Sequence, residues 1–257
     1  MHYAAASRSS DIAAVDAYTD SLLATLAAGE LPVRRKAWLA HLRMAADGYN
    51  RFDLDDSPRP AVAIVGESYV KHNEHANRGV TRWLMDQGLE VLAPQFLPLF
   101  LTSIVNARGR IRSHLARRGP AWLLAPLLGR MVMDLWQDAE SALTGFRGYR
   151  PRHAIWDVAK EAASVMSLSH AYGECWLTAG EIGLFARAGV RQVLCLQPFG
   201  CIASQVVSQG IARRLRRRYP QLAITFLDID FASSEANHQN RLHLMVSEAH
   251  AAMAERR

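Results

Sequence analysis

The alternation of short apolar segments with stretches of helical periodicity constrains the fold of this chain more than any other feature. Four such segments have the composition of buried strands, namely Ala61–Val65, Glu90–Ala93, Gln192–Leu196 and Ala223–Leu227. Stretches with helical spacing of apolar residues separate them. Strands that are joined through helices pair mainly in parallel, since the chain must cross over between them. The sequence therefore predicts an α/β fold with a mainly parallel, Rossmann-like sheet.

Two further regions are predicted to be helical. Residues 1–52 form a helical leader, because apolar residues recur at helical spacing from Asp11 to about Gly48, with a break at Gly29–Pro32. Residues 53–257 then form the α/β domain, with a helical insertion at about 99–168. A helix is expected at the end of this insertion, from Ala154 to about Leu168, and the remaining helices are expected at 78–87, 179–188, 205–217 and 234–254.

The composition is that of a folded domain. The chain has 257 residues, of which 50% are hydrophobic and 21% charged, which argues against disorder. The apolar stretch Trp122–Met133 is interrupted by Pro126 and Arg130 and is shorter than the roughly 20 apolar residues of a membrane span. The N-terminus has no apolar core of signal-peptide length. We therefore expect a cytoplasmic protein that has no membrane partner.

The formal net charge of +6 comes largely from two arginine clusters. Such clusters are typical of a solvated basic face, of a surface for an anionic partner, or of a site for a phosphate-bearing ligand. No nucleic-acid-binding motif accompanies them, so we expect no nucleic-acid partner. The clusters are Arg108, Arg110, Arg112, Arg117 and Arg118, and Arg213, Arg214, Arg216, Arg217 and Arg218.

The chain contains three cysteines and no Cys-x-x-Cys pair. An odd number in a reducing compartment argues against a disulfide framework and leaves metal binding, catalysis or burial. Cys195 lies inside a predicted strand and is expected in the core. Cys201 follows the turn Pro198-Phe199-Gly200 at the end of that strand. Ligands of open α/β sheets bind beyond the carboxyl ends of the strands, so Cys201 lies where chemistry is expected.

Polar residues also follow three of the predicted strands. Gly66 and Glu67 follow the first, Gln197 the third, and Asp228 with Asp230 the fourth. In a parallel sheet these ends converge on one edge, which makes the residues candidate ligand-binding groups, although each alone could simply form a turn.

The segment Glu67–Asn77 is predicted to be an irregular polar loop long enough to bind a ligand. His72, Glu74 and His75 in it lack the spacing of the zinc-hydrolase motif. Asn77 could cap the next helix, whose amides could meet an anion. Phosphate-binding glycine motifs and a Gly-x-Ser-x-Gly elbow are absent from the sequence. A cysteine nucleophile with His170 or His72 as base remains an alternative.

The run Pro60–Asn77, taken with Gly173-Glu174, Gln197–Cys201 and Asn240–Leu242, resembles the C-terminal region of the CoA enzyme activase proteins. That region is related to the 2-hydroxyglutaryl-CoA dehydratase component family. The resemblance covers roughly Ala14–Ala251. It implies α/β domains, an oxygen-sensitive 4Fe–4S cluster on cysteine thiolates, and a link to ATP-driven electron transfer into 2-hydroxyacyl-CoA or aromatic acyl-CoA substrates.

The resemblance also implies roles for particular residues. Cys201 matches the cysteine expected to ligate the cluster. Cys175 stands where similar sequences usually have glycine and is a second candidate metal ligand. Glu67 and Lys71 are the candidate catalytic residues. The resemblance and the strand-end positions together give the candidate ligand-binding residues, which are Gly66, Glu67, Lys71, Asn73, Asn77, Glu174, Gln197, Asp228 and Asp230.

This chain lacks the ATPase module of the activases and the cysteine-bearing region of longer relatives. A 4Fe–4S cluster usually takes four thiolates, so three cysteines leave the ligand set incomplete. The first hypothesis is therefore a subunit or stand-alone domain whose partner is an activase-type ATPase or a cysteine-bearing dehydratase subunit, or a second copy in a homodimer, with a CoA thioester as a candidate ligand. Alternatives are a non-catalytic scaffold that binds a protein or an anionic small molecule, and a zinc or cysteine hydrolase.

Overall fold

The computed structural model describes residues 1–29, 34–92, 96–117, 119–150, 152–230 and 234–255. The predicted positions Pro32, Ala93 and Arg118 lie outside these ranges. Within them, no helix combines the length and apolar character needed to span a bilayer. The chain forms two compact units, one of Met1–Pro58 with Leu127–Arg152, the other of Arg59–Pro126 with His153–Arg257.

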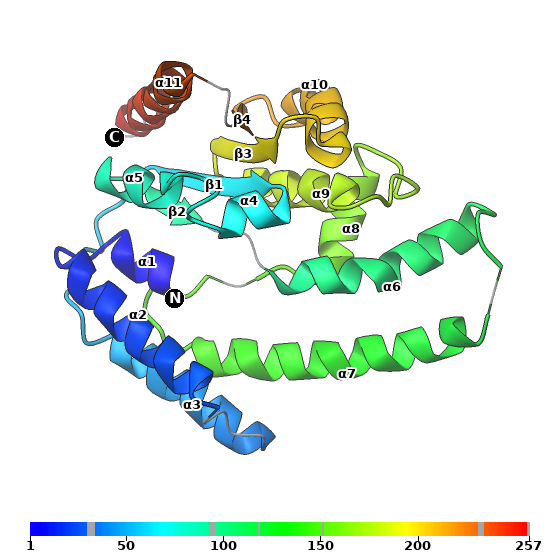
Figure 1. Ribbon diagram of the computed structural model, residues 1–257, viewed down its shortest axis with the longest axis horizontal. Helices are drawn as coiled ribbons and strands as arrows, with labels where there is room; N and C mark the ends of the chain where they lie inside the picture. Colours follow the sequence, from blue (N-terminus) through cyan, green and yellow to red (C-terminus); the bar gives the residue numbers. More distant parts are fainter. Residues whose placement is uncertain (30–33, 93–95, 118, 151, 231–233, 256–257) are drawn as a thin grey trace. The chain divides into compact units, whose positions relative to one another are not determined.

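The second unit is built on a parallel sheet, as predicted. Its strands are β1 (Ala61–Gly66), β2 (Glu90–Leu92), β3 (Gln192–Pro198) and β4 (Ala223–Ile229), in the order β2-β1-β3-β4 (Figure 1). Every pair among them is parallel. The structure thus confirms the α/β fold class.

The two middle strands form the centre of the core. Val62, Ala63 and Val65 of β1 are fully buried, and so is the run from Val193 to Leu196 in β3. Strands with helices on both faces read as continuous apolar runs, which is why both segments were recognisable in the sequence. The outer strand β4 is only partly buried, with Ile224 and Leu227 as its buried residues.

Helices surround this sheet. Helix α9 packs on β1 and α8, while α10 and α11 lie beside β4 (Figure 1). The helical elements of the unit are α4 (Ser68–His72), α5 (Val80–Asp86), α6 (Leu97–Arg112), α8 (Ile155–Ala163), α9 (Cys175–Arg187), the π-helical segment η1 (Ile202–Ser208), α10 (Gln209–Arg218) and α11 (Glu235–Ala254).

Two glycines of α9 allow it to approach α8 closely. A Cβ atom at Gly180 would lie 2.2 Å from the carbonyl oxygen of Val158. A Cβ atom at Gly183 would lie 2.5 Å from Cγ of Glu161. Neither distance is compatible with a side chain, so the spacing of these helices depends on glycine at both positions.

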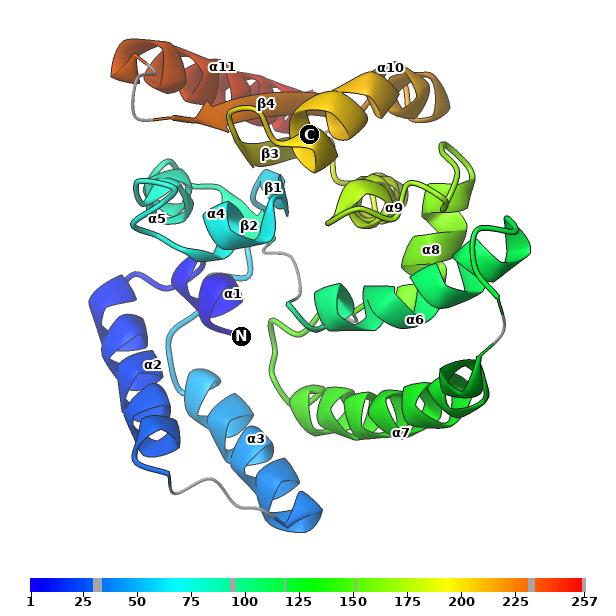
Figure 2. The same cartoon turned by 45° about the vertical axis from the view of Figure 1, so that its right-hand side comes forward.

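The first unit is helical. It contains α1 (His2–Ala6), α2 (Ile12–Ala27), α3 (Arg35–Tyr49) and the part of α7 (Pro120–Leu143) from Leu127 onward. Helices α2 and α3 lie side by side (Figure 2). Tyr49 of α3 joins them, because its hydroxyl lies 2.8 Å from the hydroxyl of Thr19 and its ring meets Tyr18 edge-on. The two helices of the predicted leader are therefore present, preceded by α1.

Several predicted boundaries are wrong. The segment Glu67–Asn77 is not an irregular loop throughout, because it contains α4. Helix α8 ends at Ala163 rather than Leu168, and α9 begins at Cys175 rather than Ala179. The α-helix expected from Gln205 begins only at Gln209, because residues Ile202–Ser208 are π-helical. Capping, π-helical winding and tertiary packing decide these ends, and apolar periodicity reports none of them.

We predict that Gly180→Ala lowers the free energy of unfolding by about 1–3 kcal/mol, because the new methyl group meets the backbone of α8. Chemical denaturation followed by circular dichroism measures this. The matched control is Gly210→Ala in α10, where a Cβ has nothing within 4 Å. That variant is expected to be as stable as wild type or slightly more stable. Equal destabilisation of both variants would contradict the close-packing argument.

Candidate functional site

The segments that follow β1, β3 and β4 lie at the carboxyl-end edge of the sheet. Gly66 pairs with Leu196, and Gln197 pairs with Asp228, so the ends of these parallel strands are in register. The topology therefore brings together the strand-end residues that the sequence singled out. This edge is where open α/β sheets bind ligands.

Gly66 sets how the chain leaves β1. Its φ is +116°, and a Cβ here would lie 2.0 Å from the carbonyl oxygen of Leu196, so only glycine fits. The next amide, that of Glu67, donates to the same oxygen at 2.9 Å. The chain thereby passes directly from the central sheet into α4.

Glu67 has a structural role as the N-cap of α4. Its carboxylate accepts hydrogen bonds from the amides of Tyr69 at 3.0 Å and Val70 at 2.9 Å. A carboxylate in this position satisfies amides that have no partner within the helix and interacts favourably with the helix dipole. The candidate catalytic carboxylate is thus already engaged by backbone donors.

Lys71, the other candidate catalytic residue, is buried in an ion pair. Its ammonium nitrogen lies 3.6 Å from Oε2 of Glu181 in α9, and the two side chains are 1% and 9% exposed. Burial raises the pKa of the Glu181 carboxyl, and the attraction of Lys71 only partly opposes this. Lys71 therefore links α4 to α9 through a buried ion pair.

The candidate asparagines also hold local structure. The Asn73 side chain accepts from the amide of Ala76 at 3.0 Å. The Asn77 amide group donates to the carbonyl of Val70 at 3.0 Å, and its oxygen accepts from the amide of Val80 at 3.3 Å. Val80 is the first residue of α5, so Asn77 has the capping role foreseen for it.

Glu174 joins two of the segments at this edge. Its carboxylate accepts a hydrogen bond from the amide of Ser68 at 3.2 Å, and the residue is buried. Ser68 begins α4, and Glu174 immediately precedes α9. The start of each helix is therefore tied to the other.

Asp228 is the centre of a polar network at the ends of β3 and β4. Its Oδ1 accepts hydrogen bonds from Gln197 at 2.5 Å and from Gln205 at 3.0 Å. The Gln205 oxygen in turn accepts from the amide of Gly200 at 2.8 Å. The network fixes the turn that leads to Cys201. Gln205, which the sequence analysis missed, completes it from η1. Asp230 follows β4, and its carbonyl oxygen accepts from Arg78 at 3.3 Å.

Several buried polar atoms lack hydrogen-bond partners among the described residues. Those of the residues that directly follow or end β1 and β3 include the hydroxyl of Ser68 and the side-chain oxygen of Gln197, while Nε2 of His72 and Oε2 of Glu181 are further examples. Gln197 is completely buried. Buried polar atoms are nearly always paired with protein, water or ligand, so these atoms have hydrogen-bonding capacity that the described residues do not use.

The cysteines occupy distinct environments. Cys201 is partly exposed and directly precedes η1, with its sulfur 3.7 Å from the hydroxyl of Ser204. Cys175 is buried at the start of α9. Burial raises its pKa, and the charge of nearby Cys201 adds to the effect. Cys195 is buried in β3, where burial raises its pKa to about 12. Its placement in the core agrees with the sequence analysis.

Known proteins give no further guide to these residues. No family model, curated protein or solved structure matches this chain.

The described residues do not form a complete metal site. They contain no group of three or more histidine, cysteine, aspartate and glutamate side chains arranged to hold a metal ion. A 4Fe–4S cluster held by these residues alone therefore does not fit. Cys201 has the exposure needed to offer one thiolate to a site that another chain completes.

His72 packs against the ring of Phe96, with the ring centres 5.1 Å apart. Burial lowers the pKa of His72 to about 4, with a further contribution from the charge of Lys71. The imidazole of His72 is therefore neutral at pH 7, and its ring meets that of Phe96 edge-on.

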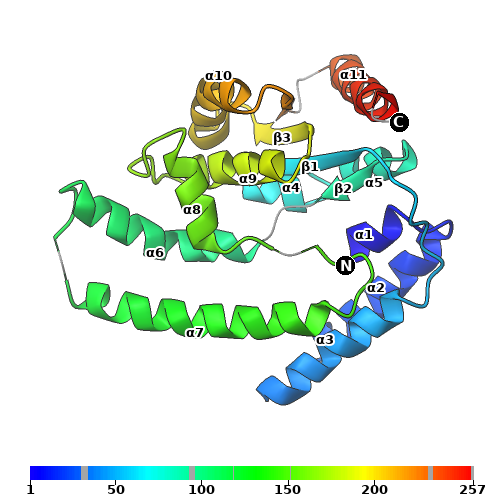
Figure 3. The ribbon, with the colours of Figure 1, turned by 180° about the vertical axis from the view of Figure 1, so that it is seen from behind.

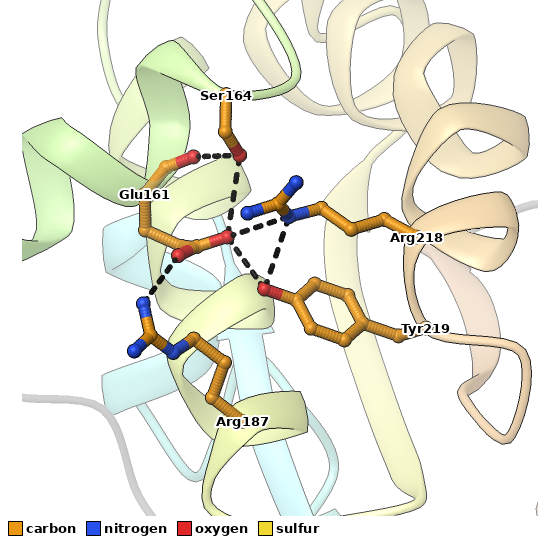
Figure 4. Close-up of polar contacts among 5 residues, drawn as sticks. All are labelled: Glu161, Ser164, Arg187, Arg218 and Tyr219. Carbon is orange, nitrogen blue, oxygen red and sulfur yellow. Dashed lines mark hydrogen bonds and ion pairs between the residues drawn. The ribbon is translucent and has the colours of Figure 1, made fainter.

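Sequence reasoning missed a polar cluster around Glu161 of α8 (Figure 4). The Glu161 carboxylate accepts hydrogen bonds from the Tyr219 hydroxyl at 2.6 Å, from Arg187 at 3.2 Å and from Arg218 at 3.3 Å. These partners come from α9 and from the end of α10. Arg218 belongs to a cluster that sequence composition alone describes as a basic face, whereas here it binds a buried carboxylate.

The cluster affects the titration of Glu161. Burial alone would raise the pKa, but the hydrogen bonds from Tyr219 and Arg187 and the charge of Arg218 outweigh it, so the pKa is lowered. The charged form is the one that the folded protein stabilises. This contribution to stability is present above the ordinary pKa of 4.5 and is lost as the pH falls through the folded value.

We predict that Glu161→Gln lowers the free energy of unfolding at pH 7 by about 2 kcal/mol, because hydrogen bonds to a charged group are lost. Urea denaturation as a function of pH measures this, and the difference from wild type should shrink below pH 4.5. Exposed Glu248 provides the control as Glu248→Gln, with little expected effect. A difference between wild type and Glu161→Gln that does not depend on pH would count against the ionic role.

We also predict that Lys71→Met lowers the free energy of unfolding by about 3–5 kcal/mol, because it leaves the Glu181 carboxyl buried without its partner. The double variant Lys71→Met with Glu181→Leu should recover at least half of this loss, since no buried charge then remains. Denaturation of the three proteins by urea is the measurement. A double variant that is no more stable than the single one would refute the pairing.

Proposed function

We propose that this chain is a subunit or separate domain of a CoA activase or 2-hydroxyacyl-CoA dehydratase-like electron-transfer system. In this proposal Cys201 supplies one thiolate to an iron–sulfur cluster that another chain shares. The observation that supports it most directly is the position of Cys201, which is partly exposed just beyond the carboxyl end of the central strand β3. The Pro-Phe-Gly-Cys turn at this position is also part of the family resemblance.

The surroundings of Cys201 suit a fixed ligand. The turn before it is held by the hydrogen bonds that join Gly200, Gln205 and Asp228. Metal ligands need such support, because groups beyond the ligands orient them. When bound, the cluster would supply one-electron transfer. The unpartnered oxygen of Gln197 and hydroxyl of Ser68 could receive polar groups of a substrate at the same edge.

The proposal requires a partner for the remaining thiolates. Cys175 lies close enough to Cys201 to interact with its charge, but it is buried. The partner in this proposal is a cysteine-bearing dehydratase subunit, an activase-type ATPase or a second copy of the chain. A reducing cytoplasmic setting agrees with it, since all three cysteines are free.

One group of observations favours a second candidate, a scaffold without catalytic residues that binds a partner protein or an anion. Glu67, Asn73 and Asn77 all use their side chains to bind backbone groups of this chain. Lys71 is paired with Glu181. Four residues that the resemblance assigns to binding or catalysis thus have structural roles here.

The deciding experiment is iron and acid-labile sulfide analysis of protein purified without oxygen, alone and with a cysteine-bearing dehydratase subunit. We expect iron and sulfide in the complex, their loss in Cys201→Ala, and their retention in Cys195→Ala, where the thiol is in the core. Circular dichroism checks that both variants fold. Iron retained by Cys201→Ala would overturn the assignment of the ligand. Folded wild-type complex without iron would favour the scaffold.

A further inference from the structure

A groove of about 390 Å³ lies between α6 and α8, away from the ends of the strands. Figure 3 shows these two helices close to each other from behind. The groove has the volume of a small-molecule site. The residues that define its character are Arg108 and Gly109 of α6, Trp156 and Lys160 of α8, and Ser167 and Ser169 beyond α8.

One side of the groove is organised around Arg108. Its guanidinium carbon lies 4.8 Å from the centre of the Trp156 ring, a distance typical of a cation–π interaction. Trp156 remains 37% exposed. Buried Val105 and Ala159 contribute apolar surface next to this pair. The guanidinium is therefore held over an aromatic ring, with its donors available to a ligand in the groove.

A second part of the lining carries hydroxyl groups. Ser113 and Ser169 lie with their oxygens 3.0 Å apart, and the Ser167 hydroxyl donates to that of Ser169 at 3.1 Å. Ser167 belongs to the stretch that was predicted to be helical to about Leu168 and is not, because α8 ends at Ala163, and Ser169 follows that stretch. Since α8 ends early, these residues reach Ser113 at the end of α6 and line the groove with hydroxyl groups.

The groove has a positive charge. Arg108 and Lys160 both line it, and no carboxylate is among the described residues that do so. Two cations and a hydroxyl donor match a phosphate group, which accepts several hydrogen bonds and carries up to two negative charges. The apolar surface beside Trp156 matches a further part of the same ligand that is not charged.

We propose that this groove binds a small organic phosphate. The phosphate would lie between Arg108 and Lys160, with the one hydroxyl proton that Ser113 and Ser169 do not use between them as a further donor, and the uncharged part would lie against Trp156 and Val105. The site does not involve Cys201 or the sheet edge. It therefore stands or falls independently of the function proposed above.

Isothermal titration with ADP in low salt tests the proposal, with pyrophosphate and adenosine as partial ligands. We expect ADP to bind more tightly than either partial ligand, because only ADP has both a phosphate and an uncharged part. Arg108→Gln and Lys160→Gln should each weaken binding of ADP by about tenfold. Ala163→Trp, which fills the groove from an exposed position without changing charge, should abolish it.

The matched control is Arg213→Gln with Arg217→Gln, two exposed arginines of α10 outside the groove. This double variant removes two positive charges, whereas Arg108→Gln and Lys160→Gln each remove one, and it should leave the affinity for ADP unchanged. Equal weakening by this control would show general attraction of anions and overturn the proposal. So would adenosine that binds as tightly as ADP, or wild-type protein that does not bind ADP. Thermal melting confirms that each variant is folded, and Lys160 is exposed enough for its replacement to be tolerated.

Discussion

The parallel pairing of β1 with β3 is the interaction on which the rest of the α/β unit depends. It aligns Gly66 with Leu196 and so brings the start of α4 to the end of the central strand. From there Glu67 caps α4, and Lys71 of the same helix reaches Glu181 of α9. The turn that ends in Cys201 leaves the neighbouring strand at the same edge. The hydrogen bonds between β1 and β3 thus bring together the candidate metal ligand Cys201, the buried ion pair of Lys71 with Glu181, and the polar network around Asp228.

The sequence predicted this ladder because burial on both faces leaves an unbroken apolar run. It did not predict α4, which has only five residues and contains Ser68, Lys71 and His72. A helix this short is not stable through propensity. It forms because a carboxylate caps it and because Lys71 finds Glu181, which is distant in the chain. The spacing of apolar residues along the chain indicates neither the cap of α4 nor its ion pair.

The same distinction applies to the candidate site. The sequence alone could place Cys201 at the sheet edge, since the turn that follows a strand of a parallel sheet lies at the carboxyl-end edge. The partners of Asp228 and of Glu161 could not be predicted, because Gln197 is 31 residues from Asp228 and Tyr219 is 58 residues from Glu161. Packing creates these contacts. The sequence shows only that polar side chains are present, and several of those chosen as binding groups hold the backbone instead.

The winding of η1 has a consequence for the direction of the thiol. A π-helix accommodates one more residue within each hydrogen-bonded loop than an α-helix, and it runs here directly into α10. The wider turns take up about one additional residue, so if the same residues were wound as an α-helix that continues α10, the chain before them would be rotated by about 100° about the helix axis. The direction in which Cys201 faces therefore depends on the winding of the segment between the strand and α10, as much as on which residues it contains.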